Sequence, residues 1–182
     1  MKMKVFLSLV LSLVFVKGAC DLPSVVSADA VLTKAQTLPS CGTVYRNEAG
    51  LVYLKVSDSY IKELLPLLKA SLPPKTAAKL QAPPTGSGQL GAHISIIYPT
   101  ELKALIDPLP ERGRKECFTV AAVNYVEPDN SDYKGVYFLQ VYSGDLNTIR
   151  TNYALSPTYQ GRDFFITIAV VPDTGDDSDG GS

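Results

Sequence analysis

One short pattern occurs twice in the chain and constrains its fold more than any other feature. The segment GAHISIIYP spans residues 91–99, and DFFITIAVVP spans residues 163–172. Each copy has a histidine or an aromatic residue, an isoleucine, a hydroxyl residue and further apolar residues before a proline. Both copies are rich in the branched and aromatic residues that favour strands. The repeat therefore predicts two equivalent β-strands and an internal duplication.

Strand geometry places the notable residues of each copy on one face. Side chains alternate between the two faces of a strand, so His93 and Ser95 share a face, roughly 6–7 Å apart at ~3.3 Å per residue. Phe165 and Thr167 share the equivalent face of the second copy. The isoleucines between them point to the other face, into a core. If the two strands lie side by side, the imidazole and both hydroxyls converge, with Phe165 beside them.

The other segments predict an α+β fold in which a strand–helix–strand unit appears twice. Strands are expected at 51–57, 90–98, 117–127, 135–144 and 163–171. Helices are expected at 58–71, 75–81, 101–107 and 145–155. Pro66 should kink or split the first helix, and Asp145 should cap the last one. The third and fourth strands are expected to form a hairpin.

The N-terminus has the form of a secretory signal. MKMK is followed by the apolar run VFLSLVLSLVFV, which is shorter than the ~20 residues of a transmembrane helix. The protein is therefore expected to be secreted or extracytoplasmic, and a lipid anchor at Cys20 is the second choice. The expected division is a signal peptide at 1–19, a poorly ordered lead-in at 20–50, one folded domain at 51–172 and a disordered acidic tail at 173–182.

Composition narrows the classes of partner. Charged residues make up 19% of the chain and the net charge is −1, so no footprint for long nucleic acid is expected, whereas a small anion in a local cleft is allowed. If Cys20 is removed or lipidated, Cys41 and Cys117 are the natural disulfide pair, and otherwise any pairing is open. A single histidine without a Cys/His cluster gives no support to a zinc site.

The duplicated HIS at 93–95 and FIT at 165–167 resemble the His-x-Ser/Thr signature of the two-histidine (2H) phosphoesterase superfamily. The flanking residues look most like its Swiss Army Knife RNA repair-like branch. The resemblance covers most of the chain, from about Leu51 to Pro172, including the element order. It implies a single bilobal domain with a central cleft. The expected protein is a monomer that acts on a small phosphodiester, cyclic nucleotide or RNA end.

The family chemistry is hydrolysis of 2′,3′-cyclic phosphates or related RNA and nucleotide phosphodiesters. One histidine takes a proton from water and the other protonates the leaving oxygen, because imidazole titrates near neutrality. The two hydroxyl residues bind the phosphate oxygens. The resemblance implies no metal or other cofactor. It assigns catalytic roles to His93, Ser95 and Thr167.

Phe165 stands where the resemblance expects the second histidine. Because a phenyl ring transfers no proton, and loss of one acid–base group costs ~10²–10⁴-fold in rate, the chain is interpreted as a degenerate phosphoesterase or pseudoenzyme. Phe165 and Tyr98 are then expected to contact the substrate. Tyr98 and Tyr159 are also candidates for the missing proton carrier, although a tyrosine with a pKa of about 10 is a poor base.

Two alternatives to an enzyme stay open. In the first, the cleft binds a phosphate or nucleotide without turnover, and Phe165 stacks on a base or ribose. In the second, the chain is a secreted interaction domain that uses neither motif, and His93 is a hydrogen-bonded structural residue. Arg150 and Arg162 are further candidates for lining the cleft from the second unit.

Overall fold

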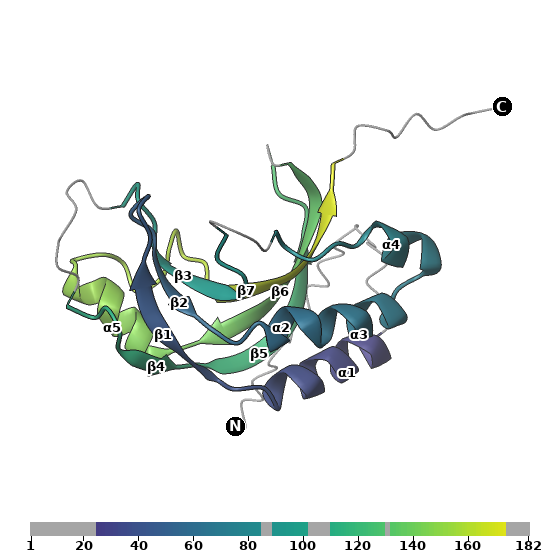
Figure 1. The fold of residues 1–182 in the computed structure, drawn as a ribbon, viewed down its shortest axis with the longest axis horizontal. Helices are drawn as coiled ribbons and strands as arrows, with labels where there is room; N and C mark the ends of the chain where they lie inside the picture. Colours follow the sequence, from purple (N-terminus) through teal and green to yellow (C-terminus); the bar gives the residue numbers. More distant parts are fainter. Residues whose placement is uncertain (1–24, 85–88, 102–109, 130–131, 174–182) are drawn as a thin grey trace, which may run out of the picture.

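Two antiparallel sheets form the framework of the protein. The computed structural model describes residues 25–84, 89–101, 110–129 and 132–173. The strands are β1 Cys41–Arg46, β2 Val52–Lys55, β3 His93–Ile97, β4 Lys115–Cys117, β5 Thr119–Val126, β6 Tyr133–Tyr142 and β7 Phe164–Pro172 (Figure 1). The first sheet has the order β3-β2-β1-β4, and the second has the order β5-β6-β7. Strands and helices together confirm the α+β class.

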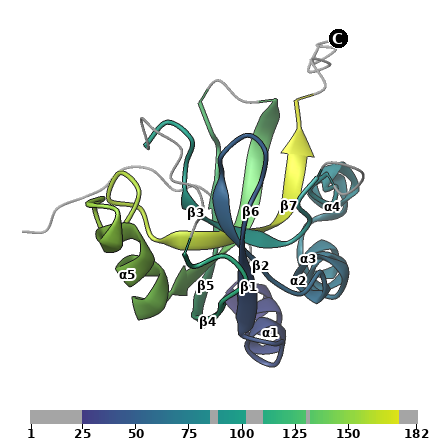
Figure 2. The ribbon, with the colours of Figure 1, turned by 60° about the vertical axis from the view of Figure 1, so that its left-hand side comes forward.

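The helices lie on two sides of the strands. They are α1 Val25–Gln36, α2 Ser59–Lys62, α3 Leu64–Ser71, α4 Pro74–Lys79 and α5 Gly144–Asn152. Figure 2 shows α5 on one side and α2, α3 and α4 on the other. The helix expected over 58–71 is split at Glu63. Pro66 causes this break, because it has no N–H for the carbonyl of Lys62 and its ring crowds that carbonyl.

The predicted duplication is visible in the topology. The first unit runs from β2 through α2, α3 and α4 to β3, and the second runs from β6 through α5 to β7. In each unit the two strands are antiparallel neighbours. The hairpin expected between the third and fourth predicted strands is also present, as β5 and β6.

The two motif strands are edge strands that meet. β3 is the edge of the first sheet and β7 the edge of the second, and the two pack against each other. Ile94 and Ile96 of β3 and Ile166 and Ile168 of β7 are fully buried. The residues between these isoleucines are only half-buried. The alternation that the sequence predicts is thus confirmed on both strands.

Three local expectations need comment. Residues 25–50 are not a poorly ordered lead-in, because they hold α1 and β1, and β1 is an interior strand between β2 and β4. Asp145 does not cap α5; the cap is Ser143, whose hydroxyl accepts the N–H of Leu146, and Asp145 lies in the first turn. The helix expected at 101–107 falls almost wholly outside the described residues.

A disulfide joins β1 to β4. Cys41 and Cys117 lie directly opposite each other on these antiparallel strands and are bonded. The bond closes a separation of 76 residues and so ties the N-terminal strand to the middle of the chain. No helix among the described residues is long and apolar enough to cross a membrane.

Candidate functional site

His93 begins β3 with a defined tautomer. Its Nδ1 lies 2.8 Å from the carbonyl oxygen of Gly91. A carbonyl oxygen only accepts hydrogen bonds, so Nδ1 carries the proton and donates it. The other ring nitrogen, Nε2, therefore keeps its lone pair. Such an imidazole is ready to accept a proton from a bound water or hydroxyl.

An ion pair holds the loop that orients His93. Lys55 is the cross-strand partner of His93, and its Nζ donates to Asp58 Oδ1 at 2.6 Å and to the Leu90 carbonyl at 2.8 Å. Asp58 Oδ1 also accepts the N–H of Ala92 at 2.9 Å. These bonds fix the backbone on both sides of Gly91. The carbonyl that orients His93 is thereby fixed as well.

Gly91 is required at this position for two reasons. Its φ is +61°, in the left-handed region that side chains disfavour. A Cβ would also lie 2.5 Å from Asp58 Oδ1 and 2.7 Å from Lys55 Nζ, so the ion pair would have to move. The loop therefore approaches the Lys55–Asp58 pair as closely as a backbone without a side chain allows.

The surroundings of His93 favour its neutral form. Burial is the main cause that lowers the pKa of His93 from its ordinary value, and the positive charge of Lys55 lowers it further. The hydrogen bond to Gly91 opposes this shift without cancelling it. The imidazole is therefore neutral at pH 7, the state that a general base needs.

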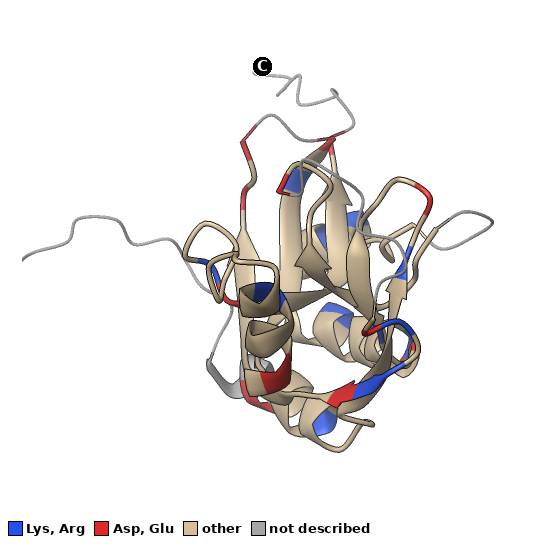
Figure 3. Cartoon of the chain, turned by 90° about the vertical axis from the view of Figure 1, so that its left-hand side faces the viewer, with Lys and Arg blue, Asp and Glu red and all other residues tan. Residues whose placement is uncertain are grey.

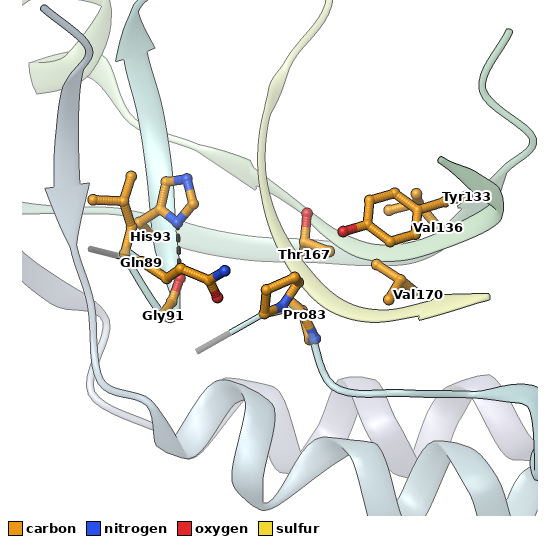
Figure 4. Close-up of a pocket in the computed structure, with 10 residues that line it drawn as sticks. Pro83, Gln89, Gly91, His93, Tyr133, Val136, Thr167 and Val170 are labelled. Carbon is orange, nitrogen blue, oxygen red and sulfur yellow. Dashed lines mark hydrogen bonds between the residues drawn. The ribbon is translucent and has the colours of Figure 1, made fainter. Parts of the chain in front are cut away.

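His93 and Thr167 line one cavity of about 320 Å³. This volume is at the small end of the range for ligand pockets, roughly 300–1,000 Å³. The wall is built from both halves of the chain, with Pro83, Gly91 and His93 on one side and Tyr133, Thr167 and Val170 on the other. Figure 4 shows the hydroxyl of Tyr133 pointing toward Thr167. The two motif strands therefore contribute to a single concave site.

The other predicted residues of the first motif lie beside this cavity, not in its wall. Ser95 is half-buried on the same face as His93. It is hydrogen-bonded to Tyr98, and burial is the main cause that raises the pKa of Tyr98. The ring of Tyr98 packs on Tyr159, with 4.3 Å between centroids. The raised pKa keeps Tyr98 protonated at neutral pH and makes it a weaker acid than an ordinary tyrosine.

Phe165 has an aromatic partner in place of a polar one. Its ring packs edge-on against Phe138, with 5.4 Å between centroids. Its cross-strand neighbour is Gln140, whose side-chain amide donates to Asp163 and Tyr142 and accepts from Asn124. Phe165 is half-buried and lies outside the wall of the cavity. A polar side chain nevertheless stands next to it on the same face.

Several features of the site were not found by sequence reasoning. Lys55 and Asp58 are three residues apart, but their contacts to Leu90 and Ala92 join segments more than 30 residues apart, so no local pattern marks their role. Tyr133 lies in the wall of the cavity, but it falls between the strands expected at 117–127 and 135–144, so no strand pattern marks it. Arg150, expected in the cleft, is instead buried and paired with Glu101, with Nη2 and Oε1 2.6 Å apart.

In the described part of the chain, neither the charged side chains nor the metal-binding ones indicate a second site. Basic and acidic residues are interspersed over the elements seen in Figure 3. Among the described residues, no three His, Cys, Asp or Glu side chains gather in a group that could hold a metal ion. His93 and Thr167, one residue from each copy of the motif, meet in the wall of the cavity between β3 and β7.

Comparison with known proteins agrees with this geometry. The family model of the Swiss Army Knife 2H phosphoesterase domain matches residues 52–174, well over half of the chain. The chain therefore belongs to this family, as the duplicated motif predicted. The match begins at the start of β2, so α1 and β1 lie outside it. No curated protein and no solved structure gives a significant match.

Proposed function

We propose that this protein binds a small cyclic phosphodiester, such as a 2′,3′-cyclic nucleotide or a cyclic-phosphate RNA end, between β3 and β7, and that it turns this ligand over slowly. The observation that carries the proposal is the shared cavity of His93 and Thr167, which joins the two copies of the motif. The family itself acts on small phosphodiesters. In this proposal the Thr167 and Ser95 hydroxyls donate to the phosphate oxygens.

His93 is the base in the proposed reaction. Nε2 takes a proton from water while the water oxygen forms a bond to phosphorus. The bond from phosphorus to the 2′ or 3′ oxygen breaks, and that oxygen leaves with the electron pair. The leaving oxygen takes its proton from solvent, and the product is a phosphate monoester with a free hydroxyl. Support for this role comes from the Nδ1–H bond to Gly91, which leaves Nε2 unprotonated.

Slow turnover is the consequence of Phe165. If Phe165 occupies the second histidine's position, no side chain there can protonate the leaving oxygen. Loss of one acid–base group lowers the rate by ~10²–10⁴-fold. The proposed protein is therefore a degenerate member of its family, with a cleft that binds better than it catalyses.

Export is the proposed context of this activity. The basic start and short apolar run of the N-terminus support a signal peptide at residues 1–19. The Cys41–Cys117 disulfide agrees with an oxidising compartment. The test is to express the full chain in a host cell and to sequence the N-terminus of the protein recovered from the medium and from the membranes. These two fractions report on export and on a lipid at Cys20. Protein that stays in the cytosol with an intact N-terminus contradicts the proposal.

Hydrolysis of 2′,3′-cyclic nucleotides by purified protein tests the catalytic part. We expect slow turnover that His93→Ala abolishes and that Arg162→Ala leaves unchanged, because Arg162, contrary to expectation, is exposed and does not line the cavity. Absence of turnover on all four cyclic nucleotides and on cyclic-phosphate RNA ends would exclude the enzyme. Equal rates for His93→Ala and the unchanged protein would show that the activity comes from elsewhere.

Binding without turnover is the second candidate, and the packing of Phe165 on Phe138 favours it. A phenyl ring held in this way offers a surface for a base or ribose. The chain has one histidine, so a single set of imidazole signals reports on the site in NMR titrations. A shift of these signals by nucleotides that are not hydrolysed supports this candidate. Unchanged signals at millimolar ligand exclude it.

A further inference from the structure

A row of aromatic rings crosses the first sheet and ends at His93. Tyr45 of β1 and Tyr53 of β2 are cross-strand partners, with 6.0 Å between ring centroids. Tyr53 lies edge-on to the imidazole of His93, with 5.9 Å between centroids. All three rings stand on the half-exposed face that carries the first motif, because directly opposed residues share a face. Figure 1 shows β1, β2 and β3 side by side.

The row is not part of the core. The opposite face of these strands is built from buried aliphatic residues: Val44, Leu54 and Ile94. Tyr45 is 40% exposed, among the most exposed large side chains that the structure describes. A second tyrosine pair in the chain, Tyr125 and Tyr137, is different, because Tyr137 is buried and the pair therefore serves packing.

We propose that Tyr53 and Tyr45 form a stacking surface for the nucleobase of a ligand whose phosphate lies beside His93. The inference rests on the proposed function and makes it more specific, since it selects nucleotides and RNA ends over phosphodiesters without a base. The identity of the ligand follows from the position of the aromatic row next to the phosphate site. The row ends at the imidazole that meets the phosphate, and in a nucleotide the base is joined to that phosphate through one ribose.

Aromatic side chains suit this role chemically. Bases stack on tyrosine rings whatever their sequence, because each base has a π-face. Successive rings along a surface can take successive bases, so Tyr53 faces the base nearest the phosphate and Tyr45 the next one. Tyr45 belongs to β1, which precedes the region matched by the family model. Of the two tyrosines, Tyr53 therefore lies within the matched region and Tyr45 outside it.

The test compares a ligand with a base to one without. Binding of 2′,3′-cyclic AMP and of inorganic phosphate is measured by calorimetry for the unchanged protein, Tyr53→Leu, Tyr53→Phe and Tyr45→Ala. Tyr125→Ala is the matched control, because Tyr125 is 39% exposed and is also stacked on a cross-strand tyrosine. Circular dichroism verifies that each variant is folded.

We expect Tyr53→Leu to weaken cyclic AMP binding by roughly 5- to 150-fold, the value of one stacked base. Phosphate binding should not change, and Tyr53→Phe should keep full affinity because the ring is retained. Tyr45→Ala should weaken binding of a dinucleotide that ends in a cyclic phosphate more than it weakens binding of cyclic AMP. Tyr125→Ala should alter neither.

Equal affinities for Tyr53→Leu and Tyr125→Ala would overturn the stacking surface, as would phosphate binding that falls in parallel with that of cyclic AMP. His93→Ala separates this failure from failure of the proposed function. If His93→Ala abolishes binding and the tyrosine variants do not weaken it, the phosphate site stands and the stacking surface falls. If neither cyclic AMP nor phosphate binds to the unchanged protein, both fall together.

Discussion

The two motif strands carry the same pattern, but the contacts around their motif residues differ: an oriented hydrogen bond for His93 and a ring contact for Phe165. β3 is fixed by charges at both ends: the Lys55–Asp58 pair beside its start and the Arg150–Glu101 pair beyond its end. β7 has polar contacts at its ends too, because Gln140 donates to Asp163 and Lys134 lies 3.5 Å from Asp173, but its motif residues are held by backbone bonds and apolar packing. Gln81 and Val170 exchange two backbone hydrogen bonds of 2.9 Å, and Phe165 packs on Phe138.

This difference follows from what each strand has to present. An imidazole is best placed to act as a base when its tautomer and direction are fixed, as the Gly91 carbonyl fixes them for His93. A phenyl ring needs shape and no oriented partner. The charged contacts around β3 thus fit a strand that presents a proton acceptor, and the contacts around β7 fit one that presents a surface.

Restoring the imidazole on β7 tests this comparison with the largest expected effect. We expect Phe165→His to raise the rate of 2′,3′-cyclic nucleotide hydrolysis by ~10²–10⁴-fold, because an acid is added for the leaving oxygen. Gln140 stands across from this position and can orient the new ring. The measurement is single-turnover hydrolysis followed by chromatography.

A double variant controls for a gain with another origin. Phe165→His combined with His93→Ala should return the rate to the level of His93→Ala or below, since the two imidazoles act together. A rate that stays high in the double variant would mean that the new histidine works alone. No gain in the single variant would mean that position 165 does not face the reacting phosphate.

Removing the charge anchor at the far end of β3 should cost the most stability. Arg150 is 1% exposed and donates to both oxygens of Glu101 and to the Ile96 carbonyl. Arg150→Met leaves the carboxylate of Glu101, whose side chain is only 12% exposed, without its partner, so we expect the free energy of unfolding to fall by roughly 3–5 kcal/mol. Urea denaturation measures it, with Arg162→Met as the exposed control.

The Arg150 anchor is tested further by a second substitution. Replacing both residues, Arg150→Met with Glu101→Met, should recover part of the loss, because neither of these two positions then carries an unpaired charge. If Arg150→Met costs no more than Arg162→Met, the pair does not hold the end of β3. In that case the contrast between the two strands is confined to their starts.

The sequence predicted those features of the two motif strands that depend on neighbouring residues in the chain. Alternation along each strand predicted that His93 and Ser95, and likewise Phe165 and Thr167, share a half-exposed face. It needs no knowledge of the partner strands. The neighbouring positions of β3 and β7 came from the duplication and the family resemblance. Pro66 was likewise a local signal, and it broke the helix as expected.

The elements that were missed depend on distant partners. β1 has one fully buried residue, Val44, and becomes a strand because β2 and β4 pair with it on both sides. β4 is only three residues long, and it pairs with β1 although the paired residues Cys41 and Cys117 are 76 positions apart in the sequence. The contact of Lys55 with Leu90 is also long-range, whereas its contact with Asp58 is local. No periodicity of 2.0 or 3.6 residues marks such contacts.

Crowding the start of β3 should have an intermediate effect. Gly91→Ala adds a Cβ that meets the Lys55–Asp58 pair, in a backbone conformation with φ of +61°. Gly113, with φ of +86° and no atom within 4 Å of an added Cβ, is the matched control. We expect Gly113→Ala to cost about 1–2 kcal/mol from the backbone alone. Gly91→Ala should cost more in urea denaturation.

The difference in unfolding free energy between the two glycine variants measures how tightly the Lys55–Asp58 pair packs against the loop. Gly91→Ala should also perturb the NMR signals of His93, because the carbonyl that orients the ring moves with the loop. Gly113→Ala should leave those signals unchanged. Equal costs and equal spectra would show that the loop tolerates a side chain and that the ion pair does not hold it.

The smallest expected effect is on the titration of His93. Lys55→Met keeps the length of the side chain but removes the charge that helps to lower the pKa of His93. The pKa should therefore rise toward its ordinary value without reaching it, because burial is the larger cause. NMR titration of the single imidazole measures the shift, and Lys69→Met, exposed on α3, is the control.

The sign of the accompanying stability change follows from linkage. Because the pKa of His93 is lower in the folded state, the unfolded chain binds more protons as the pH falls. The stability that comes from a neutral His93 is complete above the unfolded pKa and is lost as the pH falls through the folded one. Lys55→Met should reduce this acid-dependent loss, measured by urea denaturation between about pH 8 and about pH 5. An unchanged or larger loss would mean that Lys55 acts on His93 only by holding the loop and not through its charge.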